Sequence, residues 1–444
     1  MKHLSDLRGV FLCYNKEKVG YLMKDRKILL KLLKHNIERY EEDLFTAFKK
    51  DLGKSKFEVY TTEIGIIKQS ISHTIKNMDK WLKDEKVKTP LYLFGNKSKI
   101  VRSPLGKVLI ISSFNYPFQL LFEPLIGALA SGNIVVCKPS EFVPNINSVI
   151  DKILKATLDE GVVRFVQGDK EVTQNLLKEK FDLIFFTGSE KVGRIIYEKA
   201  AETLTPVVLE LGGKSPAIVY DDASLELAVS RIVWGKFLNG GQTCVAPDYV
   251  LVDKNIEKVF IEKCIASIEK MFSLEITSIV SQSHIKRLEK LIEASDVIYG
   301  GVVRGFKVMP TLIRANMSDK IMKEEIFGPI LPIVTFENNP KPYITKNPLS
   351  LYVFTEDKKK ANTLMKEVSF GGGMINNTIL HLSNPNLPFG GIGTSGMGSD
   401  HARYSMDTFT HKKAIMTSST FLNHKLLEPP YSKLQMKLMR RILK

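Results

Sequence analysis

The chain has 444 residues and a formal net charge of +16, with 25% charged and 44% hydrophobic residues. This length exceeds what one hydrophobic core usually supports, so we expect two or three domains of ordinary globular composition. Its four cysteines have no regular spacing, which excludes a disulfide framework and indicates a reducing compartment.

No apolar run reaches the length of a membrane span, and no apolar segment follows a basic stretch at the N-terminus. We therefore expect a soluble, cytoplasmic protein. The net positive charge would favour nucleic-acid binding, because a basic surface attracts phosphate. However, the lysines are spread over the whole length and do not alternate with aromatic residues, so we expect no nucleic-acid partner.

The first part of the chain is predicted to be helical. Apolar residues recur at helical spacing within residues 17–83, and Gly53 is expected to end a helix. Residues 87–102 become β-like around Gly95-Asn96, a turn signal of hairpins. We predict a short two-stranded arm that bridges domains or subunits.

Continuous apolar strands then alternate with helices. Strands are predicted at 108–112, 134–137, 182–186 and 206–210, and helices at 118–130 and 191–201. A second such unit has helices at 225–238 and 257–271 and strands at 250–252, 330–335 and 351–354. Apolar strands separated by helices indicate parallel sheets covered on both faces, so the predicted fold class is α/β with a doubly wound nucleotide-binding unit. Residues 405–417 are again β-like.

Cys244 is the best candidate for a nucleophile. It ends the run Asn239-Gly240-Gly241-Gln242-Thr243-Cys244, whose glycines let backbone pass close to a ligand and leave a small side chain facing a cleft. Cys13, Cys137 and Cys264 lie in apolar or helical settings, where a thiol is usually buried and inert. The alternative is that Cys244 is a packing residue as well.

A turn between an apolar strand and a helix carries Thr187, Gly188 and Ser189. Backbone N–H groups at such a helix start can bind a pyrophosphate, and Gly188 and Gly193 permit its close approach. An ordinary strand-to-helix turn is the alternative.

The downstream match to G-x-G-x-x-G at residues 391–396 lacks a clear preceding strand and a following helix, so we regard it as accidental.

Lys138 and Glu141 follow another apolar strand, at the edge where ligands approach open α/β sheets. Lys138 can bond ribose or phosphate oxygens, while Glu141 can accept a ribose hydroxyl and repel a 2′-phosphate. The alternative is a solvated charged turn.

Two further polar residues lie at strand ends. Glu210, beside two glycines, can serve as a general base for water if its surroundings raise its pKa. Asn115, between a buried strand and a helix, can donate to an oxyanion. The alternatives are a surface glutamate for Glu210 and a helix cap for Asn115.

The eight scattered histidines and the absence of H-E-x-x-H or paired C-x-x-C predict no metal site.

Seven ordered motifs, which span nearly the entire chain, together resemble the NAD(P)-dependent aldehyde dehydrogenases, most closely the class 3 or fatty aldehyde dehydrogenase type. The motifs are Ser113-Phe114-Asn115-Tyr116-Pro117, Lys138-Pro139-Ser140-Glu141, Phe186-Thr187-Gly188-Ser189, Glu210-Leu211-Gly212-Gly213, Gly241-Gln242-Thr243-Cys244, Glu324-Glu325-Ile326-Phe327-Gly328-Pro329 and Leu387-Pro388-Phe389-Gly390-Gly391.

The resemblance implies a Rossmann-like cofactor domain, an α/β catalytic domain and a small β arm for dimerisation. On this basis we divide the chain as follows: residues 1–84 and 104–210 bind the cofactor, 211–395 form the catalytic domain, 85–103 and 396–420 form the arm, and 421–444 form a tail. A homodimer is expected.

By the same resemblance, Cys244 is the nucleophile, Glu210 the general base and Asn115 the oxyanion donor. The residues expected to bind the cofactor are Lys138, Glu141, Thr187, Gly188, Ser189, Gly193, Leu211, Gly212, Glu325 and Phe327. The expected cofactor is NAD, with NADP left open, and the substrate is an aldehyde oxidised through a thiohemiacetal and a thioester. Thioester transfer to CoA and a catalytically silent binding protein are the alternatives.

Two segments depart from the family pattern. Residues 273–313 look short, and residues 336–349 contain three prolines where a helix is expected. Both lie in the predicted catalytic domain, so the resemblance does not define the substrate pocket.

The final residues predict a basic amphipathic helix. On a helical wheel, one side is apolar (Leu434, Met436, Leu438, Met439, Ile442, Leu443) and the other is basic (Lys433, Lys437, Arg440, Arg441, Lys444). Such a helix suits an anionic bilayer surface and predicts peripheral membrane contact. Packing on its own protein or on a partner subunit is the alternative.

Overall fold

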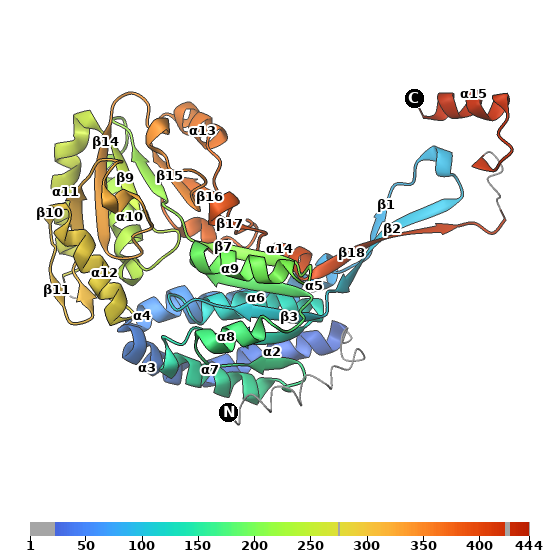
Figure 1. The fold of residues 1–444 in the computed structure, drawn as a ribbon, viewed down its shortest axis with the longest axis horizontal. Coiled ribbons are helices and arrows are strands. Elements are labelled where there is room, and N and C mark those ends of the chain that lie inside the picture. Colours follow the sequence, from blue (N-terminus) through green and yellow to red (C-terminus); the bar gives the residue numbers. More distant parts are fainter. Residues whose placement is uncertain (1–22, 274–275, 422–426, 444) are drawn as a thin grey trace.

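Two large β-sheets with flanking helices and a projecting β arm make up the fold (Figure 1). The computed structural model describes residues 23–273, 276–421 and 427–443. Cys13 and the first part of the predicted helical region, residues 17–22, lie outside this range. Both large sheets are mainly parallel, so the predicted α/β class is confirmed.

The first sheet has six strands in the order β17-β7-β6-β3-β4-β5, all parallel except β17. The strands are β3 (Lys107–Ile111), β4 (Ile134–Lys138), β5 (Val163–Phe165), β6 (Leu183–Gly188), β7 (Val207–Leu211) and β17 (Gly396–Met397). Strands β4 and β5 lie on one side of β3, and β6 and β7 lie on the other, so the strand order changes direction at β3. Ligands bind open α/β sheets beyond the carboxyl ends of the strands at such a point.

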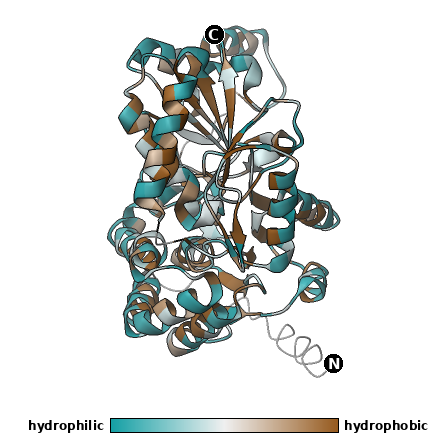
Figure 2. Cartoon of the chain, turned by 90° about the vertical axis from the view of Figure 1, so that its left-hand side faces the viewer, coloured by the Kyte–Doolittle hydropathy of each residue, from teal (hydrophilic) through white to brown (hydrophobic). Residues whose placement is uncertain are grey.

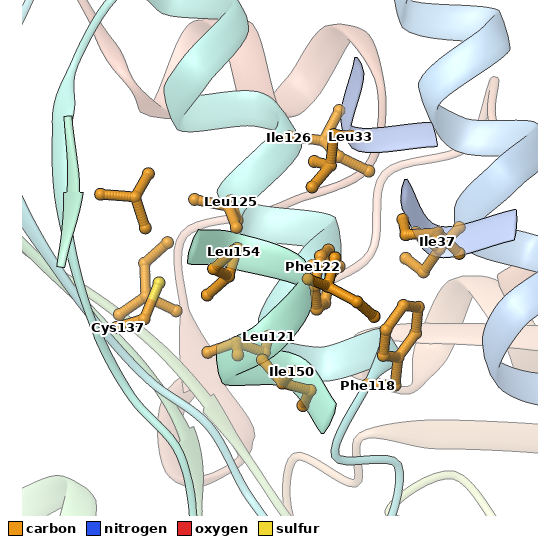
Figure 3. Close-up of a cluster of buried hydrophobic side chains, with 14 of the residues drawn as sticks. Leu33, Ile37, Phe118, Leu121, Phe122, Leu125, Ile126, Cys137, Ile150 and Leu154 are labelled. Carbon is orange, nitrogen blue, oxygen red and sulfur yellow. The ribbon is translucent and has the colours of Figure 1, made fainter. Parts of the chain in front are cut away.

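Helices bury both faces of this sheet. They are α6 (Gln119–Ser131), α7 (Pro144–Thr157), α8 (Lys170–Leu176) and α9 (Glu190–Ala201), together with helices from the start of the chain. Figure 3 shows one core, in which Leu121 and Leu125 of α6 lie near Cys137 of β4. Burial raises the pKa of the Cys137 and Cys264 thiols, as expected for inert packing cysteines.

The N-terminal helices are α2 (Met23–Arg39), α3 (Glu41–Leu52), α4 (Lys56–Val59) and α5 (Gly65–Trp81). Gly53 ends α3 with φ 68°, as predicted, because glycine adopts this left-handed conformation without strain. A π-helical turn over Tyr60–Ile64 joins α4 to α5. Such turns are rare and frequently occur at functional sites.

The second sheet has seven strands in the order β10-β13-β14-β9-β8-β15-β16, parallel except for β10. They are β8 (Pro216–Val219), β9 (Tyr249–Asp253), β10 (Asp296–Tyr299), β13 (Thr311–Arg314), β14 (Ile330–Phe336), β15 (Ser350–Phe354) and β16 (Gly372–Ile375). The surrounding helices are α10 (Leu225–Phe237), α11 (Glu257–Met271), α12 (Gln282–Glu293) and α13 (Lys358–Glu367). Figure 2 shows hydrophobic strands inside and hydrophilic helix faces outside. A small hairpin, β11 (Val303–Arg304) and β12 (Lys307–Val308), lies at one side.

The arm has one strand more than the two predicted around Gly95-Asn96, and this third strand lies within the later segment that was also predicted to be β-like and expected in the arm. The arm is a three-stranded sheet in which β2 (Asn96–Pro104) lies between β1 (Glu85–Val87) and β18 (Thr410–Ser418). Two parts of residues 396–420, which were expected in the arm, lie elsewhere. Strand β17 pairs with β7, and the start of the segment predicted to be β-like falls in the short helix α14 (Arg403–Thr408), which packs on α6. The proline-rich residues 336–349 contain only a single 3₁₀ turn at Lys341–Tyr343 in place of a helix.

The tail helix α15 (Lys433–Ile442) lies at the far end of the arm, away from the two large sheets (Figure 1). None of its residues is buried, and Ser432 caps it with a capping box. Among the described residues, no helix has both the length and the apolar character needed to cross a membrane.

Candidate active site

The predicted site residues from the first sheet converge on one edge. Asn115 follows β3, Lys138 ends β4, Gly188 ends β6 and Glu210 lies at the end of β7. These four strands are adjacent and parallel, so their carboxyl ends meet at the same edge. Cys244 reaches this edge from the second half of the chain, on the loop between α10 and β9.

Three consecutive residues with positive φ shape the loop that carries Cys244. Asn239, Gly240 and Gly241 have φ of 56°, 60° and 71°. A Cβ atom on Gly241 would lie 2.3 Å from the carbonyl oxygen of Gly328, so both the conformation and the close approach require glycine here. The loop therefore packs directly against the segment that contains Glu325 and Phe327.

The Cys244 side chain is partly exposed, unlike Cys137 and Cys264. It packs against a small apolar cluster of Val245, Leu349, Ile379 and Phe389, against which Trp234 and Leu382 also pack. Burial raises the pKa of its thiol, with repulsion from the Glu325 and Glu210 carboxyls adding to the effect, while the backbone N–H groups of Cys244 and Val245 oppose it. The thiol thus lies against apolar side chains and close enough to two carboxyl groups for their charges to raise its pKa.

Glu210 is 6% exposed and is therefore not the surface residue of the alternative interpretation. Its Oε2 accepts a 3.2 Å hydrogen bond from the Thr187 hydroxyl, whereas Oε1 is buried without a protein partner. Burial raises its pKa well above the usual range, and repulsion from Asp400 adds to the shift. A carboxylate with a raised pKa and a free oxygen is suited to accept a proton from water.

The Asn115 amide does not cap the following helix. Its Nδ2 donates a 2.9 Å hydrogen bond to the Gln242 carbonyl, two residues before Cys244. The side chain is 2% exposed, and Oδ1 has no protein partner. Since an amide NH2 has two hydrogens, one remains to donate to an oxygen at the nucleophile.

The turn after β6 has features that suit a dinucleotide. Ser189 caps α9 by accepting a hydrogen bond from the Val192 N–H, and Gly188 precedes it at the strand end. A Cβ atom on Gly193 would lie 2.6 Å from Leu211, so glycine brings α9 close to β7. Thr187 is buried, with its hydroxyl on Glu210.

Lys138 is 2% exposed and donates to the Pro139 carbonyl at 2.8 Å. Its ammonium lies 3.8 Å from the exposed Glu141 carboxylate. Burial lowers the Lys138 pKa, and Glu141 partly offsets this effect. Lys138 is therefore buried rather than part of the solvated turn of the alternative interpretation.

Glu325 and Phe327 reach the same edge from the segment before β14. The ideal Cβ position on Gly212 lies 1.9 Å from Glu325 Oε2, so the carboxyl occupies the space that a side chain at 212 would need. Burial raises the Glu325 pKa to about 8, and Asp248 adds to the shift. Phe327 has φ 48° and packs edge-on against Phe114, with ring centroids 5.8 Å apart.

Comparisons with known proteins agree with this arrangement. The family model described as "Aldehyde dehydrogenase family" matches residues 21–415. The chain belongs to the aldehyde dehydrogenase family. It is 46% identical over 421 residues to the 4,4'-diaponeurosporen-aldehyde dehydrogenase of Staphylococcus aureus, which covers 91% of this chain and 92% of that protein.

A canine aldehyde dehydrogenase (Canis lupus familiaris) described as dimeric and NADP-preferring is 38% identical over 415 residues, covering 90% of this chain and 91% of that protein. A solved structure, "Substrate bound state of Staphylococcus Aureus AldH", matches with a TM-score of 0.93 at 44% identity and covers 95% of each chain. The protein is an enzyme of the aldehyde-oxidising type, and its cofactor is NAD or NADP.

The sequence did not reveal two buried charged clusters of this aldehyde dehydrogenase. In the first, Asp248 accepts from the Lys214 ammonium at 2.6 Å and from the Ile326 N–H at 3.1 Å. Lys214 also donates to the carbonyls of Ile321 and Glu324, both at 3.0 Å. This cluster fixes the backbone on both sides of Glu325. Burial of charges cannot be read from sequence, although Lys214 and Asp248 each lie within four residues of a recognised motif.

In the second cluster, Lys54 and Glu63 form an ion pair of 3.0 Å with both side chains fully buried. Lys54 also donates to the Asn115 carbonyl at 3.0 Å. No signal in the sequence pointed to this pair, since Lys54 is separated from Asn115 by 61 residues. Among the described residues, no cluster of side chains is suited to hold a metal ion.

The close approach of Glu325 to Gly212 gives a first prediction. In Gly212→Ala, the new methyl group must displace the Glu325 carboxyl, so we expect at least a tenfold loss of affinity for NAD or NADP, about 1.4 kcal/mol. Quenching of protein fluorescence on cofactor titration measures it. Gly305→Ala is the control, because a Cβ atom there has no neighbour within 4 Å. Unchanged affinity in Gly212→Ala would contradict a role for Glu325 in cofactor binding.

The raised pKa of Glu325 gives a second prediction. Between the usual carboxyl pKa of 4.5 and about 8, the folded protein retains a proton that the unfolded chain has released. The free energy of unfolding therefore decreases as pH rises through this window, by at most about 1.4 kcal/mol per pH unit for this group. Glu325→Gln cannot titrate, so its stability relative to wild type should increase from pH 5 to pH 8.

Urea unfolding of the cofactor-free proteins at pH 5, 6.5 and 8 measures this difference. Glu324→Gln, which replaces the exposed neighbouring carboxyl, is the matched control. A stability difference between Glu325→Gln and wild type that does not depend on pH would exclude the proposed protonation of Glu325.

Proposed function

We propose that the protein oxidises apolar aldehydes to carboxylic acids through a thioester on Cys244. The observation that carries the proposal is the partly exposed Cys244 thiol, which packs against an apolar cluster, has its pKa raised by the charges of Glu325 and Glu210, and follows by two residues the carbonyl that the Asn115 amide binds. The apolar cluster favours an apolar substrate, whose reacting end would meet the polar groups.

In the first half of the reaction, the Cys244 thiolate attacks the aldehyde carbon and the carbonyl oxygen becomes an oxyanion. The free hydrogen of the Asn115 amide and the Cys244 backbone N–H donate to this oxygen, which stabilises the tetrahedral thiohemiacetal. When bound, the nicotinamide of the cofactor accepts the hydride from the former aldehyde carbon and brings a positive charge close to the thiol. Loss of the hydride leaves a thioester on Cys244.

In the second half, Glu210 takes a proton from water, and the resulting hydroxide attacks the thioester carbon. The carbon–sulfur bond breaks, the acid leaves, and the Cys244 thiolate is restored. The free Oε1 of Glu210 is the acceptor, and Thr187 holds the other oxygen. The raised pKa of Glu210 makes its carboxylate a stronger base than an exposed one.

The cofactor is held along the edge of the first sheet in this proposal. Gly188, Ser189 and the start of α9 bind the pyrophosphate, while Lys138 and Glu141 bind the adenosine ribose. The remaining assigned residues, Thr187, Gly193, Leu211, Gly212, Glu325 and Phe327, shape the path toward Cys244. An exposed carboxylate at Glu141 opposes a 2′-phosphate and favours NAD over NADP.

The proposed substrate class rests on the apolar cluster beside Cys244 and on the similar proteins. The Staphylococcus aureus relative is named for diaponeurosporen-aldehyde. An apolar environment around Cys244 suits polyene, aromatic and medium or long-chain aliphatic aldehydes alike. Acyl transfer to CoA is the competing reaction, but Glu210 beside the thiol favours water. Intact Cys244, Glu210 and Asn115 also disfavour a catalytically silent binding protein.

The main prediction concerns turnover. Wild type should reduce NAD with apolar aldehydes in a panel from acetaldehyde to hexadecanal and benzaldehyde, and Cys244→Ala should lose about 10⁴-fold in rate. Glu210→Gln should release one equivalent of NADH rapidly and then turn over about 10²–10⁴-fold more slowly, because the thioester accumulates. NADH absorbance and intact-protein mass spectrometry measure both.

Cys264→Ala, which removes a buried thiol, is the control and should retain activity. Steady turnover that requires CoA would favour the acyl-transfer alternative. Full activity in Cys244→Ala would exclude the mechanism.

We infer a homodimer with peripheral membrane contact. Large apolar side chains of the arm are exposed, including Leu91, Phe94 and Met416, and the canine relative is described as dimeric. At the end of the arm, Leu434, Met436 and Leu443 of the tail are 66%, 58% and 63% exposed. The tail does not bury its apolar side on its own subunit, which leaves a membrane surface or the partner subunit.

Deleting residues 431–444 tests the membrane contact. The full chain should co-sediment with vesicles containing phosphatidylserine at low salt, and the truncated chain should not, since each basic residue near an anionic surface contributes about 1 kcal/mol. Neutral vesicles are the control, and light scattering checks that both forms remain dimers. Equal vesicle binding by both forms would exclude the idea, and loss of the dimer on truncation would favour packing on the partner.

A further inference from the structure

A buried ion pair lies behind the candidate active site, outside the residues assigned to chemistry. Lys54 follows Gly53 at the end of α3, and Glu63 lies in the π-helical turn before α5. Both side chains have 0% exposure, and Nζ lies 3.0 Å from Oε1. Burying two charges costs several kcal/mol each, and their attraction often does no more than offset this cost. Stability alone is therefore a weak explanation for the pair.

Each member of the pair holds a different part of the segment after β3. The Lys54 ammonium donates to the Asn115 carbonyl at 3.0 Å and lies 4.3 Å from the centre of the Tyr116 ring. Glu63 Oε2 accepts from the N–H groups of Phe118 and Gln119, at 3.2 and 2.9 Å, where α6 begins. The ion pair thus fixes the backbone on both sides of the turn that carries the Asn115 amide.

The turn that carries Asn115 is itself hydrogen-bonded to the loop that carries Cys244. The Asn115 amide donates to the Gln242 carbonyl at 2.9 Å, and the Tyr116 hydroxyl shares a 2.7 Å hydrogen bond with the Thr243 hydroxyl. From the other side, Asn239 donates to the Asn115 carbonyl at 2.9 Å. Lys54 and Asn239 therefore both donate to the Asn115 carbonyl oxygen. A continuous series of hydrogen bonds joins the ion pair to the residues just before Cys244.

We propose that Lys54 and Glu63 are positioning residues that set the place of the Asn115 amide relative to Cys244. The π-helical turn brings Glu63 into line with the start of α6, and the three donor hydrogens of the ammonium suit two oxygens and a ring face. A displacement of the amide by about 1 Å weakens oxyanion stabilisation about 10²-fold. The proposal rests on the proposed function, because it concerns the same site.

Acylation of Cys244 by p-nitrophenyl acetate isolates this role, because an activated ester forms the oxyanion and the thioester without cofactor or hydride transfer. The variant is Lys54→Met with Glu63→Gln, which leaves no unpaired buried charge. We expect it to acylate 10–100-fold more slowly than wild type, with KM for aldehyde and NAD within threefold of wild type. The matched control is Lys56→Met, since Lys56 lies two residues away at the start of α4 and forms an exposed ion pair with Glu42 of α3.

A double-mutant cycle with Asn115→Ala distinguishes positioning from support of the fold. Asn115→Ala alone should slow acylation about 10²–10³-fold. Adding the Lys54/Glu63 change should then cost less than threefold further, because the amide that the pair positions is already absent. Multiplicative losses, or acylation by the Lys54/Glu63 variant within twofold of wild type, would overturn the proposal.

If the paired variant does not fold, Lys54→Arg takes its place in the cycle. It keeps the charge, but its larger head group displaces the Asn115 carbonyl, so we expect a smaller loss of acylation rate than in the paired variant. Combined with Asn115→Ala, this loss should again be less than the product of the two separate losses. Ester acylation also separates this proposal from the proposed function. A wild-type protein that is acylated at Cys244 but oxidises no aldehyde would refute the function and still report on Lys54.

Discussion

The hydrogen bond from the Asn115 amide to the Gln242 carbonyl joins the two halves of the enzyme at the point where chemistry is expected. Asn115 follows a strand of the first sheet, while Gln242 belongs to the loop that leads into the second. Neither sheet alone brings the proposed oxyanion donor to the loop that carries the proposed nucleophile. One buried hydrogen bond contributes only about 1 kcal/mol to stability, but leaving its partners unpaired costs about 1–3 kcal/mol each. The contact therefore strongly disfavours other alignments of the two halves.

Charge is the second constraint on this edge of the sheet. Three buried or partly buried groups, Cys244, Glu210 and Glu325, each have a raised pKa, chiefly because burial favours their neutral forms; repulsion adds to the shift, from Glu325 and Glu210 at Cys244, from Asp400 at Glu210 and from Asp248 at Glu325. Each shift disfavours the charged form of its group. A cationic nicotinamide beside these groups would favour the thiolate and the carboxylates.

The sequence predicted most of the first sheet because its strands are continuous apolar runs bounded by glycine or polar turns. The grouping of Cys244, Glu210 and Asn115 rested on the resemblance to the aldehyde dehydrogenases, because Cys244 lies on a loop of the second half of the chain and no strand pattern relates it to the first sheet. The arm was harder, because pairing between β2 and β18 joins residues about 300 positions apart and α14 is too short for a clear helical period. Buried charges such as Lys54 and Asp248 look like surface residues in sequence, and only tertiary contacts reveal them.

The location of the Lys54–Glu63 pair suggests why helices from the start of the chain matter to a site built from later segments. An apolar pair of similar volume would pack well between α3 and α6 and could be as stable. It would leave the Asn115 carbonyl with one donor instead of two and the first N–H groups of α6 without an acceptor. Those groups define where the turn after β3 lies. Directional hydrogen bonds fix a position to within tenths of an ångström, whereas contact between apolar surfaces does not. Oxyanion stabilisation depends on position at that scale.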